Sequence, residues 1–428
     1  MGATSLEIST RSSEPRQADE PFEAAVPRLV TEIRSGCIDA FDDIALRPDS
    51  ASSLSRSLGL QLGLGWKIWQ VLTEDDPFVA AQHVPGRPGF KLFFKALTGA
   101  GATPTTVADL DEIAESFEYA VQQHGGDRST FDMMLASNAR SADSRAELNH
   151  RRTAFRGNSF TFGLRCDAAF TRFIVAPSSH DPSRCDIVGT HGFINLTRLR
   201  ADVPWRMSRG STLMSSGRSQ SPRHAEPLFT DSSTDHTRVI PELPLLVDYC
   251  STPLPEFRRI LGRSERIGYE LAPGQVGAQG GITCLVGEIF RAVYPRFASE
   301  EDSLSSFRMP LKTPAETAVF ELIAHQDVLG GRTPMLDVVC DVYEEVALVE
   351  KLQSDRLPTY DPLEDLGPPH RARPSKAIPK YAELTVRTFE RAGWSPDDFT
   401  VFRIEMRYPP IASSAFLSFP LPTPQEEP

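Results

Sequence analysis

Residues 158–175, NSFTFGLRCDAAFTRFIV, mark the point where the hydrophobic pattern of the chain changes. The stretch is rich in Phe, Thr and Val, and Phe160, Phe162 and Leu164 recur at every second position. Since successive side chains of a strand point to opposite faces, this alternation predicts a β-strand. Apolar residues before the stretch follow helical spacing, whereas several later segments alternate like strands. We therefore expect an α+β fold that is helical at its N-terminal end and β-rich beyond.

Helical spacing extends over residues 23–152. In the first helix Leu29, Ile33 and Cys37 recur every four residues, and Pro48 ends the pattern. Further helices are expected at residues 51–58, 62–72, 88–97, 107–124 and 130–152. We place a helical domain at residues 23–152, behind a polar segment, residues 1–22, whose composition predicts disorder.

Residues 153–352 predict a mixed, mainly antiparallel β-rich domain. Strands are expected at residues 158–175, 185–199, 243–249, 265–271 and 335–343. Two further segments, residues 283–293 and 316–325, fit a short helix or a strand, and periodicity does not decide between them.

The C-terminal part predicts a small separate module. Residues 353–376 are polar and Pro-rich, which is typical of a linker. Within residues 377–428 the spacing predicts an amphipathic helix at 378–392 and strands at 399–408 and 411–419. We expect the two strands to form a hairpin beside the helix.

Composition limits the functions that the chain can have. It has 428 residues, a net charge of −12 and a sequence pI near 5.3, whereas proteins that coat nucleic acid are usually basic overall. A local basic face is still compatible with this acidity, because salt screens distant charges within about 10 Å. No apolar run approaches the ~20 residues of a membrane span, and residues 1–20 lack the apolar core of a signal peptide. We expect a cytoplasmic chain with no membrane partner.

One motif stands out in the helical part: residues 51–72, ASSLSRSLGLQLGLGWKIWQVL. Leu54 and Leu58 are placed to face a core, Ser55 permits a close helix approach, and Gly59 fits a tight turn. The second helix has its apolar anchors at Ile68, Val71 and Leu72. The pattern resembles helix-turn-helix and winged-helix transcription regulators, over these residues alone.

The resemblance implies binding to double-stranded DNA. Gln61, Lys67 and Gln70 would be the exposed polar groups, and Gln and Lys side chains can pair with adenine and guanine edges. Phosphate contacts are expected from Arg56 and from Arg151 and Arg152, the latter two within a basic stretch that continues through Arg172, Arg198 and Arg206.

Three features depart from this pattern. Gly63 and Gly65 lie where the second helix should be firm, and each costs about 1 kcal/mol relative to Ala. Trp66 and Trp69 are bulky, and Lys67 is the single basic residue of that helix. The alternative is an ordinary helical hairpin in a scaffold or protein-interaction protein, which would present an exposed apolar patch around the tryptophans.

The remaining chemistry-bearing residues do not form a recognisable catalytic motif, so we expect no catalytic residue, metal or cofactor. His180 and His191 near Cys185, and His224 and His236 near Asp231, lack the paired spacing of a zinc site. The chain has no G-x-S-x-G sequence. The acidic cluster Asp337, Asp341, Glu344 and Glu345 is typical of a solvated edge.

A further alternative is an enzyme of unfamiliar type with its site in the β-rich domain. Oligomeric state, including a homo-oligomer, stays open.

Overall fold

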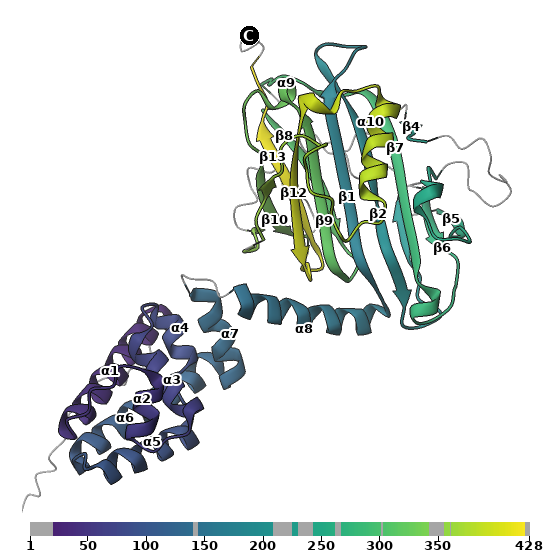
Figure 1. Cartoon of the computed structure of the whole chain (residues 1–428). Helices are drawn as coiled ribbons and strands as arrows, with labels where there is room; N and C mark the ends of the chain where they lie inside the picture. Colours follow the sequence, from purple (N-terminus) through teal and green to yellow (C-terminus); the bar gives the residue numbers. More distant parts are fainter. Residues whose placement is uncertain are drawn as a thin grey trace, which may run out of the picture. The chain divides into compact units, whose positions relative to one another are not determined.

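The computed structural model describes residues 20–139, 144–208, 225–229, 243–261, 267–300, 303–341, 355–359 and 361–423. The chain divides into two compact units between Glu147 and Leu148. The first is helical and the second is built on mainly antiparallel β-sheets, so the α+β fold expected from the sequence is confirmed (Figure 1).

The helical unit packs short helices around one apolar core. Its elements are α1 (Phe22–Asp43), α2 (Ala51–Ser57), α3 (Leu62–Thr73), α4 (Pro77–Gln82), α5 (Arg87–Ala100), α6 (Pro104–Ala120), η1 (Val121–Gly125) and α7 (Arg128–Asn138). Val26 and Val30 of α1 are fully buried against Phe90, Phe117 and Phe131 from three other helices. Side chains of Ser50, Asp76, Thr103 and Asp127 cap four helix starts, each cap being worth about 1 kcal/mol.

Helix α8 (Ser144–Phe162) corrects two expectations. A single helix at 130–152 is instead split into α7 and α8, and residues 158–162 are helical rather than strand. Phe160 and Phe162 are 77% and 48% exposed, so their alternation does not mark a buried face. Gly163, at φ +70°, ends the helix, and Arg200 donates to the carbonyl oxygen of Phe160 at 3.1 Å.

A seven-stranded sheet forms the centre of the second unit, in the order β11-β12-β9-β1-β2-β7-β4. Its strands are β1 (Leu164–Pro177), β2 (Arg184–Arg198), β4 (Ala225–Pro227), β7 (Ile282–Pro295), β9 (Ala315–His325), β11 (Glu364–Asp365) and β12 (Phe399–Arg407). β1 and β9 pair in parallel, and the other neighbours are antiparallel. The two segments left open by periodicity are thus strands. Runs of consecutive buried residues in β7 and β9 show why alternation was absent there.

Two three-stranded sheets complete the unit. One has the order β10 (Met335–Cys340), β13 (Ser413–Pro420), β8 (Leu304–Leu311), and the other β3 (Arg206–Ser208), β6 (Ile267–Leu271), β5 (Phe257–Leu261). Short helical turns are η2 (Val247–Tyr249), η4 (Ala278–Gly280), α9 (Gln326–Leu329) and η6 (Pro396–Asp398).

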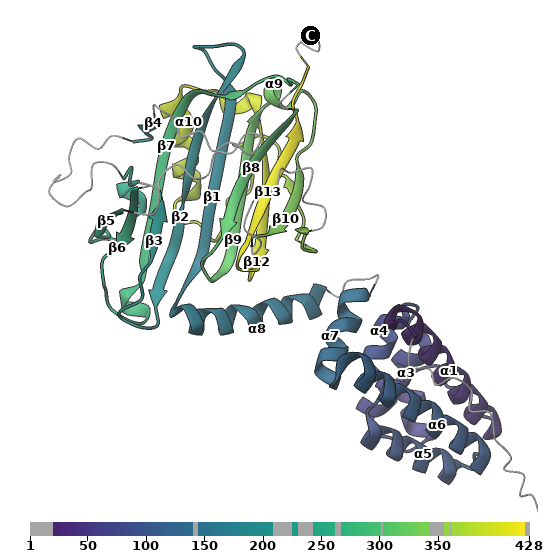
Figure 2. The ribbon, with the colours of Figure 1, turned by 180° about the vertical axis from the view of Figure 1, so that it is seen from behind.

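The central sheet is covered on both faces. Phe173 and Phe320 pack against Phe307 and Leu417 of the β10-β13-β8 sheet. On the opposite face, α10 (Tyr381–Ala392) buries Leu384 among residues of β1, β9 and β12. Figures 1 and 2 show α10 and the β10-β13-β8 sheet on opposite sides of β1 and β9.

The expected C-terminal helix-plus-hairpin module is not seen as a separate unit. β12 pairs with β9 and β11, whereas β13 pairs with β10 and β8 in the other sheet. The connection carries Pro409 and Pro410 between Tyr408 and Ala412, both at positive φ, which is unsuited to a tight two-residue turn. Each strand is completed by buried contacts of its own sheet rather than by the other strand.

Candidate nucleic-acid interface

Helices α2 and α3 are two short neighbouring helices joined by a short turn in the helical unit. The Ser50 hydroxyl oxygen accepts the backbone N–H of Ser53 at 3.1 Å and caps α2. Gly59, at φ +62°, makes the turn that the sequence predicts, and the backbone N–H of Leu60 donates to the carbonyl of Ser55 at 2.9 Å. Leu54 is fully buried in the core.

Gly65 is the point where α3 crosses α2. A Cβ atom at this position would lie 1.9 Å from the Ser55 hydroxyl oxygen and 3.2 Å from the Ser55 Cα. Ile68 and Val71, on the same side of α3, are each 1% exposed. Gly65 was a departure from the motif in the sequence, and the structure gives it a packing role. Gly63 has nothing within 4 Å and leaves the outer face of α3 open.

The candidate DNA-contacting residues of this unit lie at its surface. Arg56, Gln61 and Lys67 are exposed, and Gln70 is half-buried. Positions 63, 67 and 70 are four and three residues apart, so Gly63, Lys67 and Gln70 share one face of α3. We call this face, together with Arg56 and Gln61, the α2–α3 surface.

Charge is unevenly distributed over the helical unit. Residues 20–139 contain nine Lys or Arg and 17 Asp or Glu, yet residues 51–73 and 77–108 contain no acidic residue. The basic residues in these two stretches are Arg56, Lys67, Arg87, Lys91 and Lys95. Arg87 is paired with Asp111 of α6 at 2.6 Å, and Lys91 and Lys95 of α5 are exposed. The basic residues of these stretches therefore lie on α2, α3 and α5, while the acidic residues lie mainly on α1 and α6 and in residues 74–76, which follow α3.

Large apolar side chains accompany the polar ones on α3. Leu62 is 62% exposed and Trp66 is 45% exposed, with the Trp66 ring edge-on to His83 at a centroid distance of 4.9 Å. Trp69 is half-buried against the core. The exposed face of α3 is therefore partly apolar, unlike a purely polar DNA-recognition helix. The exposed Leu62 and Trp66 favour the protein-interaction alternative.

Arg151 and Arg152 belong to the second unit. Arg151 is 11% exposed, forms an ion pair with Asp361, and donates to the carbonyl of Arg407 at 3.3 Å. Its charge is thus compensated within the second unit. Arg152 is exposed on α8.

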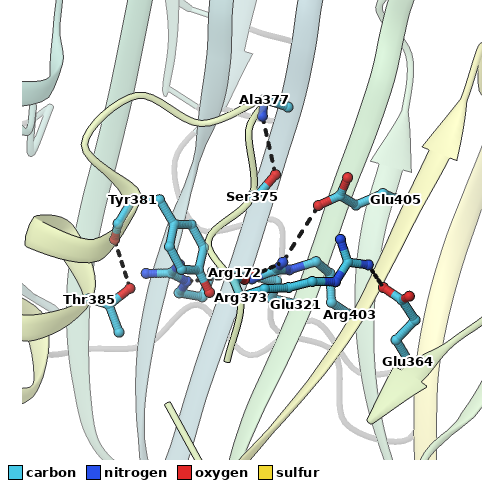
Figure 3. Close-up of polar contacts among 10 residues, drawn as sticks. All are labelled: Arg172, Glu321, Glu364, Arg373, Ser375, Ala377, Tyr381, Thr385, Arg403 and Glu405. Carbon is cyan, nitrogen blue, oxygen red and sulfur yellow. Dashed lines mark hydrogen bonds and ion pairs between the residues drawn. The ribbon is translucent and has the colours of Figure 1, made fainter. Parts of the chain in front are cut away.

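One arginine of the expected basic stretch, Arg172, is buried in the central sheet beside two further charged residues, Glu321 and Arg403 (Figure 3). Arg172 of β1, Glu321 of β9 and Arg403 of β12 are cross-strand neighbours, and each side chain is at most 1% exposed. The Nε of Arg172 donates to Glu321 Oε2 at 2.7 Å, and the Nε of Arg403 donates to Oε1 at 2.5 Å. Burial tends to raise the pKa of Glu321, but the two guanidinium groups outweigh it and hold this pKa below its usual value.

This buried cluster is suited to holding α10 on the sheet. The Tyr381 ring of α10 lies 4.5 Å from the guanidinium carbon of Arg172 and 4.9 Å from that of Arg403. Arg172 Nη1 and Nη2 have no hydrogen-bond partner among the described residues, and the rings of Tyr381 and Phe170 take the place of acceptors. Arg172 lies in the basic stretch of the sequence, but it is buried and cannot face a phosphate. An arginine within the apolar run FTRFIV is the sequence signal for a buried, paired charge.

No group of three or more His, Cys, Asp or Glu side chains in the described part of the chain could hold a metal ion. Asp186 instead pairs with Arg291 at 2.8 Å, and Asp337 with Arg356 at 3.1 Å. Five members of the histidine and acidic clusters considered from the sequence lie outside the described residues: His224, Asp231, His236, Glu344 and Glu345. None of the described helices is both long and apolar enough to cross a membrane.

Comparison with models of protein families, with curated proteins and with solved structures finds no match to this chain. Function must therefore be argued from the α2–α3 surface and from the sites of the second unit.

Proposed function

We propose that the chain is a DNA-binding regulator of the cytoplasm, in which the α2–α3 surface contacts double-stranded DNA. The observation that carries the proposal is the seating of Gly65 on Ser55, which turns Gly63, Lys67 and Gln70 outward on one face of α3. A helix-turn-helix reader places its second helix in the major groove by this kind of geometry. The β-rich unit would then bind an effector or a partner.

The side chains of the α2–α3 surface have separate roles in this proposal. Lys67 and Gln70 reach base edges, since Lys pairs with guanine and Gln with adenine in the major groove. Gln61 stands at the start of α3, and Arg56 on α2 is placed for a phosphate. The open space around Gly63 allows the helix backbone to approach the duplex closely.

Charge reversal at Lys67 tests this arrangement. We expect Lys67→Glu to weaken binding of the whole chain to a labelled duplex by about tenfold or more, because a base contact is replaced by repulsion from phosphate. Fluorescence anisotropy measures the affinity.

Lys376→Glu serves as the matched control, since Lys376 is an exposed lysine of the second unit and its replacement changes the net charge equally. Equal losses for the two variants would show a response to net charge alone and would contradict a reader on α3.

A second candidate is a protein-interaction module that uses the exposed Leu62 and Trp66. It predicts that Leu62→Ser changes self-association or partner binding, while no duplex binds in a salt-sensitive way. Light scattering across a concentration series reports self-association, including any homo-oligomer. The DNA-binding proposal instead predicts that Leu62→Ser leaves duplex affinity within about threefold, since apolar contacts contribute little to phosphate recognition.

A further inference from the structure

A cavity of about 170 Å³ lies in the second unit, between the central sheet and the end of β8. Thr171 of β1 and His191 of β2 form its floor and are direct cross-strand partners. They lie on the sheet face that β8 covers, opposite to the face that carries Arg172 and α10. The cavity is thus separate from the buried charge cluster.

The floor of the cavity offers polar groups without protein partners. No hydrogen bond joins the Thr171 hydroxyl or the His191 ring to a described residue, and both side chains line the cavity. Both groups face the cavity, so a ligand or water within it can exchange hydrogen bonds with them. Desolvation lowers the pKa of His191 to about 4, and at neutral pH its ring therefore presents one donor and one acceptor nitrogen.

One wall of the cavity is aromatic and fixed in place. Trp205 meets Phe193 edge-on at a centroid distance of 4.1 Å, and its indole N–H donates to the Thr313 hydroxyl at 3.3 Å. Met309 and Leu311 of β8 add apolar surface. A planar ring is suited to such a wall, because aromatic contacts favour stacked or edge-on geometry. The volume matches that of an engineered cavity of about 150 Å³ that holds benzene.

Charge around the opening is positive. Lys312 and Arg206 line the cavity, and no Asp or Glu is among the described residues that line it. Lys312 is exposed and has no ion pair within the described ranges. Arg206 shares Glu270 with Arg258, so that a single carboxylate faces two guanidinium groups. An anionic group at this opening gains favourable electrostatic interaction.

We propose that this cavity binds a small aromatic carboxylate. The ring packs on Trp205, the carboxylate lies toward Lys312, and a hydroxyl on the ring exchanges hydrogen bonds with Thr171 and His191. The inference goes beyond DNA binding and does not depend on it, because every group involved belongs to the second unit.

Calorimetric titration of the whole chain with 4-hydroxybenzoate, benzoate and benzyl alcohol tests the proposal. We expect 4-hydroxybenzoate to bind most tightly and benzyl alcohol most weakly. Thr171→Val and His191→Gln should each weaken 4-hydroxybenzoate by about tenfold, since each removes a hydrogen bond in a desolvated site, and benzoate by about twofold at most. Lys312→Met should weaken both carboxylates by about threefold and leave benzyl alcohol unchanged, while Lys376→Met changes nothing.

A second readout separates lost binding from misfolding. Binding should quench the fluorescence of Trp205, and Trp205→Phe should remove that signal, while thermal unfolding shows whether each variant is folded. The proposal is overturned if none of the three probes binds the wild-type chain. It is also overturned if binding survives all of the floor and wall substitutions, or if benzyl alcohol binds as tightly as benzoate.

Discussion

At the scale of single residues, Gly65 and Gly63 of α3 are close in sequence but differ in their surroundings. Gly65→Ala would place a methyl group against Ser55, whose Cα and hydroxyl oxygen both lie within van der Waals distance of the new atom. We expect this change to lower the free energy of unfolding by about 1–3 kcal/mol, the usual cost of overpacking, despite the better helix propensity of Ala. Urea denaturation measures it.

Gly63→Ala is the matched control for this prediction. It meets nothing within 4 Å, so only propensity and unfolded-state entropy change, and the free energy of unfolding should rise by about 0.5–1 kcal/mol. Equal effects at the two positions would contradict the close crossing of α2 and α3.

Glu321 carries the second prediction at this scale. Glu321→Gln leaves Arg172 and Arg403 buried without their shared carboxylate, and we expect a loss of about 3–5 kcal/mol in the free energy of unfolding. Glu364→Gln is the control, because its ion pair with Arg373 is partly exposed and should contribute less than about 1 kcal/mol. Comparable losses in the two variants would contradict a structural role for the buried cluster.

The same cluster makes stability depend on pH. The folded-state pKa of Glu321 lies below its ordinary value, so its stabilising contribution is fully present above the unfolded pKa. That contribution is lost as the pH falls through the folded pKa, when the carboxylate is protonated between the two guanidinium groups. Unfolding of wild type and Glu321→Gln should therefore converge as the pH is lowered, and a constant difference down to strongly acidic pH would contradict this assignment.

At the scale of elements, the prediction is that Phe155, and not Phe160, anchors α8 to the second unit. Phe155 is 6% exposed and packs on Tyr408 with ring centroids 5.2 Å apart, whereas Phe160 is 77% exposed. Phe155→Ala should cost about 3 kcal/mol of unfolding free energy and Phe160→Ala less than about 0.5 kcal/mol. Thermal or urea unfolding measures both losses. A larger loss for Phe160→Ala than for Phe155→Ala would show that residues 158–162 bury the alternating face of a strand.

The same elements show what the sequence could predict. Spacing located α2, its glycine turn and α3, because these depend on local capping and periodicity. It misassigned residues 158–162, since alternation of Phe160 and Phe162 has the same appearance whether or not the face is buried. It also paired β12 with β13, because strand partners are chosen by long-range packing that a local pattern does not contain.

The candidate sites also differ in how far the sequence could predict them. Exposure of Lys67 follows from the period of an amphipathic helix and was expected, whereas Gln70, expected to be exposed as well, is half-buried. The cavity at Thr171 and His191 was not, because its walls come from β1, β2, β8 and the residues around Trp205, which meet only in the folded sheet.

At the scale of the whole molecule, an acidic chain with a net charge of −12 is proposed to bind a polyanion. Residues 51–73 and 77–108 of the helical unit contain no acidic residue, and their exposed basic residues Arg56, Lys91 and Lys95 are the ones available to phosphates. With so few cations, binding should be weak and its salt dependence shallow, because the slope scales with the number of phosphates that are neutralised.

The dependence of duplex affinity on salt tests this account most directly. With two to four phosphate contacts, the logarithm of the binding constant of the whole chain should fall with the logarithm of salt concentration with a slope of about −2 to −4. Arg56→Gln should reduce the steepness by about one, because Arg56 is the residue of the α2–α3 surface that is placed for a phosphate. A slope near zero, or one that Arg56→Gln leaves unchanged, would contradict DNA binding through α2 and α3.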